Sequence, residues 1–210
     1  MQETLLNLSL KTHLSYGASQ FGLNCINTAY GINILFFYTT ILKFDSALFG
    51  IVMLIGQMWD AISDPLMGHI SDNTRWKSGR RRPYFLLGSI PTGIMFFLIF
   101  SPPFMKSSSL IFIYLTVTTL IFYTGRTVFE TPYLALAPEL TLDYNERTKL
   151  SGFKQLLGTL GDAQGAILPL VLFTVLHEQR RTAHFVYGLV GCAIMIALSA
   201  LTHWGTFEKP

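Results

Sequence analysis

Two aspartates spaced four residues apart, Asp60 and Asp64, lie within a long apolar stretch of the chain. On a helix this spacing puts both carboxylates on one face about 6 Å apart, where they repel by roughly 3 kcal/mol at an effective dielectric near 20. One bound cation or one shared proton removes that repulsion. Because hard cations prefer oxygen ligands, the pair predicts a site for Na⁺, Li⁺ or H⁺. The structural alternative is that one Asp caps a helix at Pro65 and the other pairs with an Arg.

Two further acids, Glu130 and Asp162, also lie in apolar stretches. A charge at mid-bilayer costs about 2.5 to 3.5 kcal/mol on the insertion scale, so four such acids indicate a polar pathway. Arg126 precedes Glu130 by four residues and can neutralise it within one helix, whereas a functional interpretation places Glu130 in the same cavity as the aspartates. Asp162 lies in the glycine-rich range 158–165, where close helix packing is as good an explanation as a pathway role.

The elements that carry these residues follow from composition. Of 210 residues, 50% are hydrophobic and 13% are charged, against about 25% charged in a soluble domain. This balance indicates a membrane protein and excludes a disordered chain; two cysteines are too few for a disulfide-stapled module. With a net charge of only +3, we expect no nucleic-acid partner. Apolar stretches predict an all-α membrane protein, a single bundle of six transmembrane helices, at 15–42, 47–71, 84–103, 108–136, 151–175 and 184–205.

The basic residues predict the orientation of this bundle. With a cytoplasmic N-terminus, nine lie at inside ends and loops: Lys11, Arg75, Lys77, Arg80, Arg81, Arg82, Arg147, Lys149 and Lys209. Four lie outside: Lys43, Lys106, Arg180 and Arg181. The positive-inside rule therefore places both termini in the cytoplasm. The first twelve residues lack the pattern of a cleavable signal peptide, so we expect none.

Several motifs together resemble one family. The run Trp59 to Asp72 (WDAISDPLMGHISD), followed by Arg75 and by Gly79 to Pro83 (GRRRP), resembles the second span and following loop of the glycoside, pentoside and hexuronide cation symporters. This is a branch of the major facilitator superfamily typified by melibiose permease. Further similar motifs are Leu14 to Gly17 (LSYG), Glu130 to Tyr133 (ETPY), Pro138 and Leu142 to Arg147 (LDYNER).

The resemblance implies roles for particular side chains. Asp60 and Asp64 match the paired acids that hold the coupling cation, Na⁺ in sodium-coupled members, with Thr127 at a further ligand position. Ser63 stands before the second Asp, where sodium-using relatives often have Asn, so Na⁺ and H⁺ coupling both remain open. No cofactor other than the coupling cation is expected.

The same resemblance implies a solute site. Glu130 matches the fourth-span acid of the sugar site, and Asn24 stands where melibiose permease carries a sugar-binding Asp. A fifth-span Arg is replaced by Gln155, beside Lys154, and a stacking Trp by Leu134, so no galactoside specificity is implied. The candidate solute-binding residues are Glu130, Asn24, Gln20, Arg126, Gln155 and Lys154.

The loop after the second span matches the cytoplasmic gating motif of the superfamily. There, basic side chains meet Asp72 and helix ends and hold the outward-facing state together. The candidate gating residues are Gly68, Asp72, Arg75, Gly79, Arg80 and Arg81.

Together these features predict cation-coupled transport of a sugar, glycoside or similar small polar solute by alternating access. The superfamily has twelve helices in two halves, so this chain corresponds to the N-terminal half and needs a second six-helix half or subunit. The alternatives are a truncated or split half that acts only as a membrane subunit or interaction partner, and an intramembrane aspartyl protease. We expect no enzyme, because the protease motif is incomplete around Asp162. The expected location is a cell membrane.

Overall fold

A computed structural model describes residues 8–76, 79–105, 107–175 and 180–207, and over these residues the chain is helical with short connections. The elements are α1 Leu10–Phe36, the π-helical η2 Phe37–Ile41, α2 Ser46–Asn73, α3 Arg82–Phe100, α4 Ser108–Leu140, α5 Tyr144–Val175 and α6 Arg180–Gly205. Lys77, Lys106 and Lys209, which entered the orientation count, lie outside the described residues, as do residues 1–7 of the segment considered for a signal peptide.

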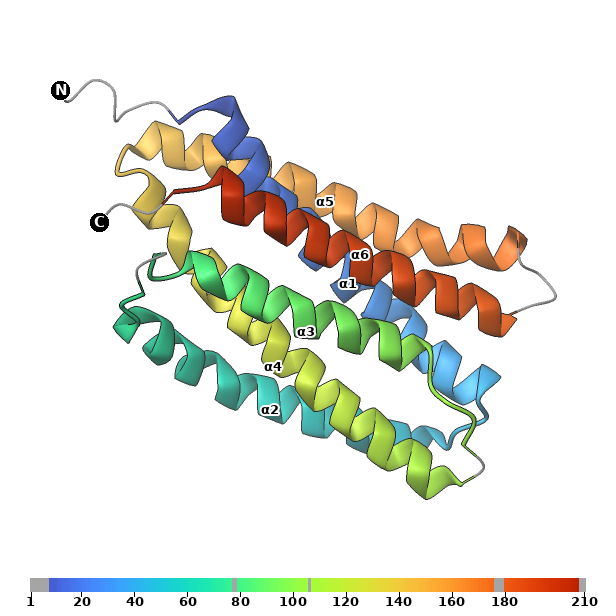
Figure 1. Ribbon diagram of the computed structural model, residues 1–210. Coiled ribbons are helices and arrows are strands. Elements are labelled where there is room, and N and C mark those ends of the chain that lie inside the picture. The colour runs from blue at the N-terminus through green and yellow to red at the C-terminus, as the bar shows by residue number, and fades with distance from the viewer. Residues whose placement is uncertain (1–7, 77–78, 106, 176–179, 208–210) are drawn as a thin grey trace.

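The helices alternate in direction along one bundle, so that α1 begins and α6 ends at the same end (Figure 1). α1 packs against α5 and α6, and α4 packs against α2 and α3. Contacts between α3 and α6 join the two groups. Segments far apart in sequence therefore become neighbours, above all α1 with α5 and α2 with α4.

Four helices of the described chain, α2, α3, α4 and α6, are long and apolar enough to cross a membrane. By length and composition, these helices agree with the all-helical membrane protein expected from the sequence. α1 and α5 have 27 and 32 residues, which exceeds the length of about 20 residues that a span needs. They are the two helices that place polar side chains such as Asn24 and Asp162 against each other, which lowers their hydropathy.

α4 and α5 extend beyond the predicted spans 108–136 and 151–175. α4 continues through Pro132 and Pro138 to Leu140, and α5 already begins at Tyr144. The Asp143 carboxylate accepts a hydrogen bond from the Glu146 backbone N–H at 2.8 Å, which caps the first turn of α5. The connection between the two helices is therefore shorter than the predicted spans imply and covers only residues 141–143.

α1 and α5 approach each other at the glycines around Asp162. A Cβ atom on Gly161 would lie 2.3 Å from the Phe21 carbonyl oxygen, and one on Gly165 would lie 2.4 Å from that of Cys25. Only glycine permits backbones this close, as in small-residue contacts between membrane helices. Close helix packing in the range 158–165 is therefore confirmed, and it brings Asp162 against α1.

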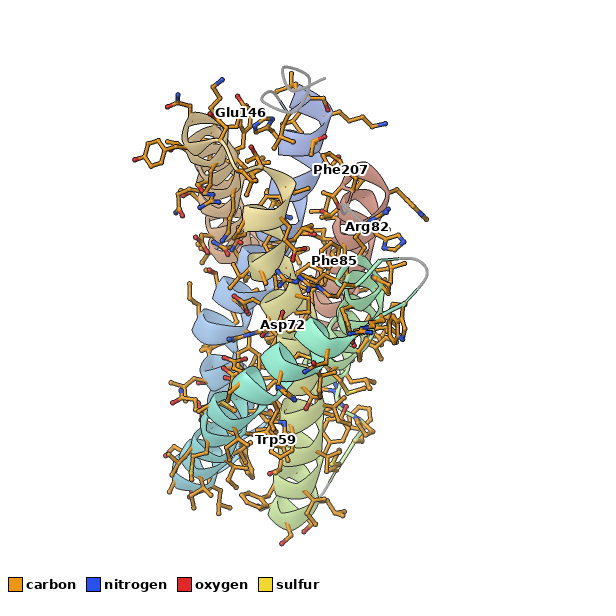
Figure 2. All side chains as sticks on the ribbon, turned by 90° about the vertical axis from the view of Figure 1, so that its left-hand side faces the viewer. Trp59, Asp72, Arg82, Phe85, Glu146 and Phe207 are labelled. Atoms are coloured by element: carbon orange, nitrogen blue, oxygen red, sulfur yellow. The ribbon has the colours of Figure 1, made fainter. Side chains whose placement is uncertain are left out.

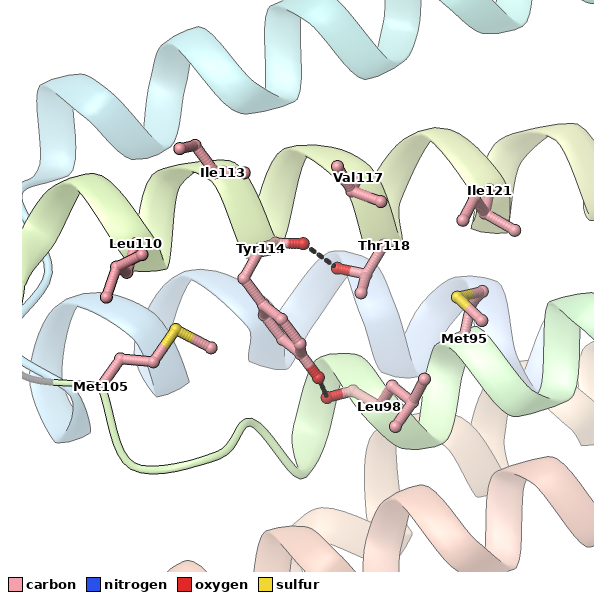
Figure 3. Close-up of a pocket in the computed structure, with 9 residues that line it drawn as sticks. All are labelled: Met95, Leu98, Met105, Leu110, Ile113, Tyr114, Val117, Thr118 and Ile121. Atoms are coloured by element: carbon pink, nitrogen blue, oxygen red, sulfur yellow. Dashed lines mark hydrogen bonds between the residues drawn. The ribbon is translucent and has the colours of Figure 1, made fainter.

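A groove of about 560 Å³ lies between α3 and α4, lined by apolar side chains such as Met95, Leu98 and Ile121 (Figure 3). The Tyr114 hydroxyl donates to the Leu98 carbonyl at 2.8 Å, so its polar tip is satisfied within the protein. None of the candidate site residues lines this groove. The chemistry predicted from the sequence lies elsewhere, on α1, α2, α4 and α5.

Candidate cation and solute sites

The two aspartates of α2 meet the hydroxyl of Thr127 on α4. Thr127 Oγ1 lies 2.9 Å from Asp64 Oδ1, 3.2 Å from Asp60 Oδ1 and 3.2 Å from Ser63 Oγ. A hydroxyl carries one proton, so it donates to one of the two carboxylates at a time. The structure thus brings the four candidate cation ligands together, with Asp60, Ser63 and Asp64 all around the hydroxyl oxygen of Thr127.

Packing between α2 and α4 positions this cluster. A Cβ on Gly56 would lie 2.8 Å from both Thr119 and Tyr123, so α2 rests closely on α4 one turn before Asp60. The Trp59 indole N–H donates to Thr124 Oγ1 at 2.7 Å. These contacts fix how α2 is aligned with α4. In this alignment, one face of α2 directs Asp60, Ser63 and Asp64 toward Thr127.

Arg126 compensates part of the negative charge. Its Nη2 lies 3.1 Å from Asp60 Oδ2, and its Nε lies 3.1 Å from Glu130 Oε2. The predicted pairing of Arg126 with Glu130 is therefore observed, and the pairing of one Asp with an Arg is observed as well. The capping alternative fails, because α2 continues through Pro65 to Asn73. Two carboxylates share one guanidinium, and Asp64 adds a third acid for which the described residues show no ion pair, which leaves this cluster acidic.

The donor set fits a small cation that prefers oxygen. Two carboxylates and two hydroxyls converge, and oxygen ligands of this kind suit hard ions. Over the described residues, no group of three or more His, Cys, Asp or Glu side chains is placed to hold a metal ion. Hydroxyl groups, rather than a third acid, complete the cluster of Asp60, Ser63, Asp64 and Thr127.

A second polar cluster joins α1 to α5. Asn24 Nδ2 donates to Asp162 Oδ2 at 2.9 Å, and Thr28 Oγ1 donates to Asp162 Oδ1 at 2.6 Å. Gln20 Nε2 donates to Asn24 Oδ1 at 2.6 Å. Two of the candidate solute-binding residues, Gln20 and Asn24, are therefore linked to an acid that the sequence left without an assigned role.

The remaining candidates on α5 lie differently. Lys154 Nζ lies 5.8 Å from the centre of the Tyr133 ring, over its face, and the side chain is half-buried. Gln155 is exposed, and within the described part of the chain its side chain has no hydrogen bond to either cluster. Glu130 and Arg126 belong to the α2–α4 cluster.

The candidate gating residues gather at the end of the bundle where α2 ends and α3 begins. The buried Arg81 guanidinium lies 2.9 Å from Asp72 and 3.4 Å from Glu139, which stands at the end of α4. Arg80 also pairs with Glu139. Arg82 donates to the His203 carbonyl on α6, and Arg82 is labelled next to this helix in Figure 2. These contacts tie α2, α3, α4 and α6 together.

Other residues of this loop act through the backbone or stand apart. Gly79 has φ 115°, a left-handed conformation that favours glycine. A Cβ on Gly68 would lie 3.8 Å from Thr131, so Gly68 is in ordinary contact with α4. Arg75 is exposed, and no ion pair to it is seen in the described part of the chain.

Residues 15–210 match the protein family described as MFS/sugar transport protein. The chain belongs to this family. It is 37% identical to the uncharacterized symporter sll1374 of Synechocystis over 80% of the chain and 31% of that protein. It is 31% identical to the putative glycoside/cation symporter YagG of Escherichia coli, over 80% of the chain and 36% of that protein. It is 30% identical to the isoprimeverose transporter of Lactiplantibacillus pentosus, over 76% and 33%.

This member of the MFS/sugar transport family thus spans about a third of the length of these curated relatives. The relatives are named as symporters or transporters, and their kinship agrees with the resemblance to cation symporters that the motifs indicated. The family and the apolar helices make the chain an integral membrane protein.

Sequence reasoning about this family member missed two acids. Glu139, which lies between the predicted spans 108–136 and 151–175, is the partner of Arg80 and Arg81. Glu146, at the α1–α5 corner labelled in Figure 2, is buried and accepts hydrogen bonds from the Leu8 N–H and from Lys149. The second had a signal, because Asp143 and Glu146 have the three-residue spacing of a helix capping motif.

Proposed function

We propose that this chain is the N-terminal, cation-binding half of a secondary transporter that couples Na⁺ or H⁺ to uptake of a sugar or similar small polar solute. Asp60 and Asp64, with Ser63 and Thr127, hold the coupling ion. Binding of that ion relieves the repulsion between the carboxylates and stabilises the conformation that binds solute, so the loaded protein changes between its two open states.

One observation carries this proposal: the Thr127 hydroxyl lies within hydrogen-bond distance of both aspartates but has one proton for them. Whichever of Asp60 Oδ1 and Asp64 Oδ1 does not receive this proton is left to bind a different proton or a cation. Arg126 reaches Asp60 through a different oxygen, Oδ2, and no such pair to Asp64 is found in the described ranges. A monovalent cation or a proton between the two Oδ1 atoms supplies the missing charge.

The family and the polar residues on the helices support the proposed solute class. One relative is named for glycosides and another for isoprimeverose, which supports a sugar or glycoside as the solute. The side chains proposed to contact it are Glu130, Arg126, Lys154, Gln20, Asn24 and Gln155.

The transport cycle needs more than this chain. We place both termini in the cytoplasm with six spans, and we assign the contacts of Arg80 and Arg81 with Asp72 and Glu139 to closure of the cytoplasmic side. A second six-helix half, or a second subunit, completes the solute pathway in this proposal.

The test uses the full-length gene product that contains this chain, reconstituted into liposomes. Uptake of radiolabelled isoprimeverose, D-xylose and D-galactose is measured under an imposed Na⁺ gradient and, separately, an H⁺ gradient. We expect accumulation with one of the two gradients and its loss in Asp60→Asn and Asp64→Asn. Asp45→Asn is the matched control: Asp45 is an exposed cap of α2, and Asn caps about as well. Gradient-driven uptake that survives in both site variants would overturn the proposal.

The alternative is that the chain is a membrane subunit without transport of its own. Reconstitution of the 210-residue chain alone addresses it, because half of a pathway should give no solute-dependent cation flux. Flux from the isolated chain would instead indicate that two copies form a complete transporter.

A further inference from the structure

Asp162 differs from Asp60 and Glu130 in the helical bundle because its partners are neutral. Its two carboxylate oxygens accept from Asn24 and Thr28, whereas Asp60 and Glu130 share Arg126. Within the described ranges, no Lys, Arg or His forms an ion pair with Asp162. An acid in this setting, on a helix with a predicted membrane span, calls for a further partner.

The hydrogen-bonding capacity around Asp162 is incomplete. A carboxylate offers about four lone-pair positions, and two of those on Asp162 are used. Among the described residues, Gln20 Oε1 is buried without a hydrogen-bond partner, while the Nε2 atom of the same amide donates to Asn24. The amide groups of Gln20 and Asn24 each keep a second N–H. The cluster therefore offers acceptors at Asp162 and Gln20 with amide donors beside them.

The cluster is both held in place and open to a ligand. Gln20, Asn24, Thr28 and Asp162 are half-buried rather than sealed. A Cβ on Gly158 would lie 3.0 Å from Gln20 Cγ and 3.1 Å from Asn24 Nδ2. Because Gly158 has no side chain, the amides of Gln20 and Asn24 fit against α5 at this position. This contact fixes how the polar side chains of α1 are aligned with Asp162.

We propose that Asp162, positioned by Asn24 and Thr28, binds hydroxyl groups of the transported solute and selects neutral polyhydroxylated solutes over anionic ones. A sugar hydroxyl donates to Asp162 or to Gln20 Oε1 and accepts from the free amide N–H groups. A solute carboxylate meets the negative charge of Asp162, with no paired cation beside it to compensate. This inference rests on the proposed function, but it concerns the polar cluster between α1 and α5 and not the proposed cation site between α2 and α4.

The test measures binding by the purified full-length gene product. Thermal-shift titrations use D-glucose, D-galactose, D-xylose and isoprimeverose, with D-glucuronate and D-galacturonate as anionic counterparts. We expect at least one neutral sugar to bind, and each uronate to bind more weakly than its parent hexose. Asp162→Asn should weaken binding of that neutral sugar at least tenfold and reduce the discrimination against uronates. Thr28→Val should weaken it severalfold, and Thr148→Val, which removes an exposed α5 hydroxyl bonded within its own helix, should leave it unchanged.

A second set of variants separates binding from folding. Asp162→Glu keeps the charge but displaces it by one methylene. Unlike Asp162→Asn, it should retain the discrimination against uronates, and its apparent affinity for the neutral sugar should be below that of the wild type. If Asp162→Asn does not fold, Asp162→Glu and Thr28→Val carry the test. Unchanged affinity in these variants, tighter binding of a uronate than of its parent hexose by the wild type, or binding of none of the sugars would overturn the inference.

Transport measurements distinguish this inference from the proposed function. If Asp60→Asn abolishes the cation dependence of uptake while Asp162→Asn leaves the KM for the sugar unchanged, the inference fails and the proposed function stands. If the wild type shows no cation-dependent accumulation but sugar binding still falls in Asp162→Asn, the proposed function fails and the role of Asp162 stands.

Discussion

The Arg126 guanidinium ties α4 to α2 through an ion pair with Asp60, in which Nη2 lies 3.1 Å from Oδ2. The same side chain lies 3.1 Å from Glu130, so one cation compensates two carboxylates. The three side chains are 20% to 27% exposed, and where solvent reaches such pairs it screens them. Arg126 thus has a structural role, because it holds Asp60 and Glu130 together, in addition to its proposed role in binding solute.

Arg126→Gln should destabilise the protein by about 1 to 3 kcal/mol, because Asp60 loses a charged hydrogen-bond donor and Glu130 loses its ion-pair partner. The measurement is thermal unfolding of the 210-residue chain in detergent. Adding Asp60→Asn to Arg126→Gln should recover part of the loss, since one uncompensated charge is then removed. If the two substitutions are simply additive, the ion pair contributes no coupling.

Thr127→Val should lower the apparent affinity for the coupling cation at least tenfold, because the hydroxyl between Asp60 and Asp64 is lost. Thr127→Ser keeps the hydroxyl and should retain most of the affinity. The measurement is the cation concentration that gives half-maximal uptake by the full-length gene product. Thr116→Val is the matched control on α4, since the Thr116 hydroxyl donates only to a carbonyl of its own helix. Equal affinity in the Val and Ser variants would remove Thr127 from the site.

The sequence predicts the order of the long helices because apolar stretches alternate with charged or Pro-containing breaks, but it places the end of α4 too early and the start of α5 too late. It also marks Asp60 and Asp64 as candidate ion ligands, because two acids in an apolar stretch are costly whatever the fold. The resemblance to known symporters added Thr127, which lies 63 positions beyond Asp64 in the sequence. Spacing within a single helix could not supply this contact, which depends on how α2 packs on α4.

Contacts between distant helices account for what could not be predicted. Asp162 and Thr28 are separated by 134 positions and meet only because glycines on α5 allow α1 to approach. Glu139 likewise meets Arg80 across 59 positions. In each case the residue types were visible in the sequence, but their partners depend on helix pairing.

Gly161→Ala should destabilise the bundle, because the added Cβ would lie 2.3 Å from the Phe21 carbonyl oxygen, a backbone atom that cannot turn away. Gly152→Ala is the matched control on the same helix, since nothing lies within 4 Å of its Cβ position. There, the better helix propensity of Ala should stabilise by about 0.5 to 1 kcal/mol. Thermal unfolding of the two variants in detergent checks both signs. Equal melting temperatures would contradict the close contact of α1 with α5.

Glu146 gives the first turn of α5 a defined dependence on pH. Lys149 Nζ donates to its carboxylate at 2.7 Å and the Leu8 N–H donates at 3.0 Å, and these bonds hold the pKa of Glu146 below its ordinary value, which is about 4.3. A carboxyl whose folded pKa is lowered stabilises the fold above its unfolded pKa. That stabilisation is lost as the pH falls through the folded pKa.

Glu146→Gln should therefore lower the melting temperature at neutral pH, and the difference from the wild type should shrink as the pH falls below about 4.3. Lys149→Met, which removes the strongest of these bonds, should show the same trend with a smaller amplitude. Lys11→Met is the matched control, because Lys11 is an exposed lysine on α1. The measurement is thermal unfolding of the 210-residue chain in detergent from pH 3 to 7. A difference between Glu146→Gln and the wild type that stays constant over this range would contradict the lowered pKa.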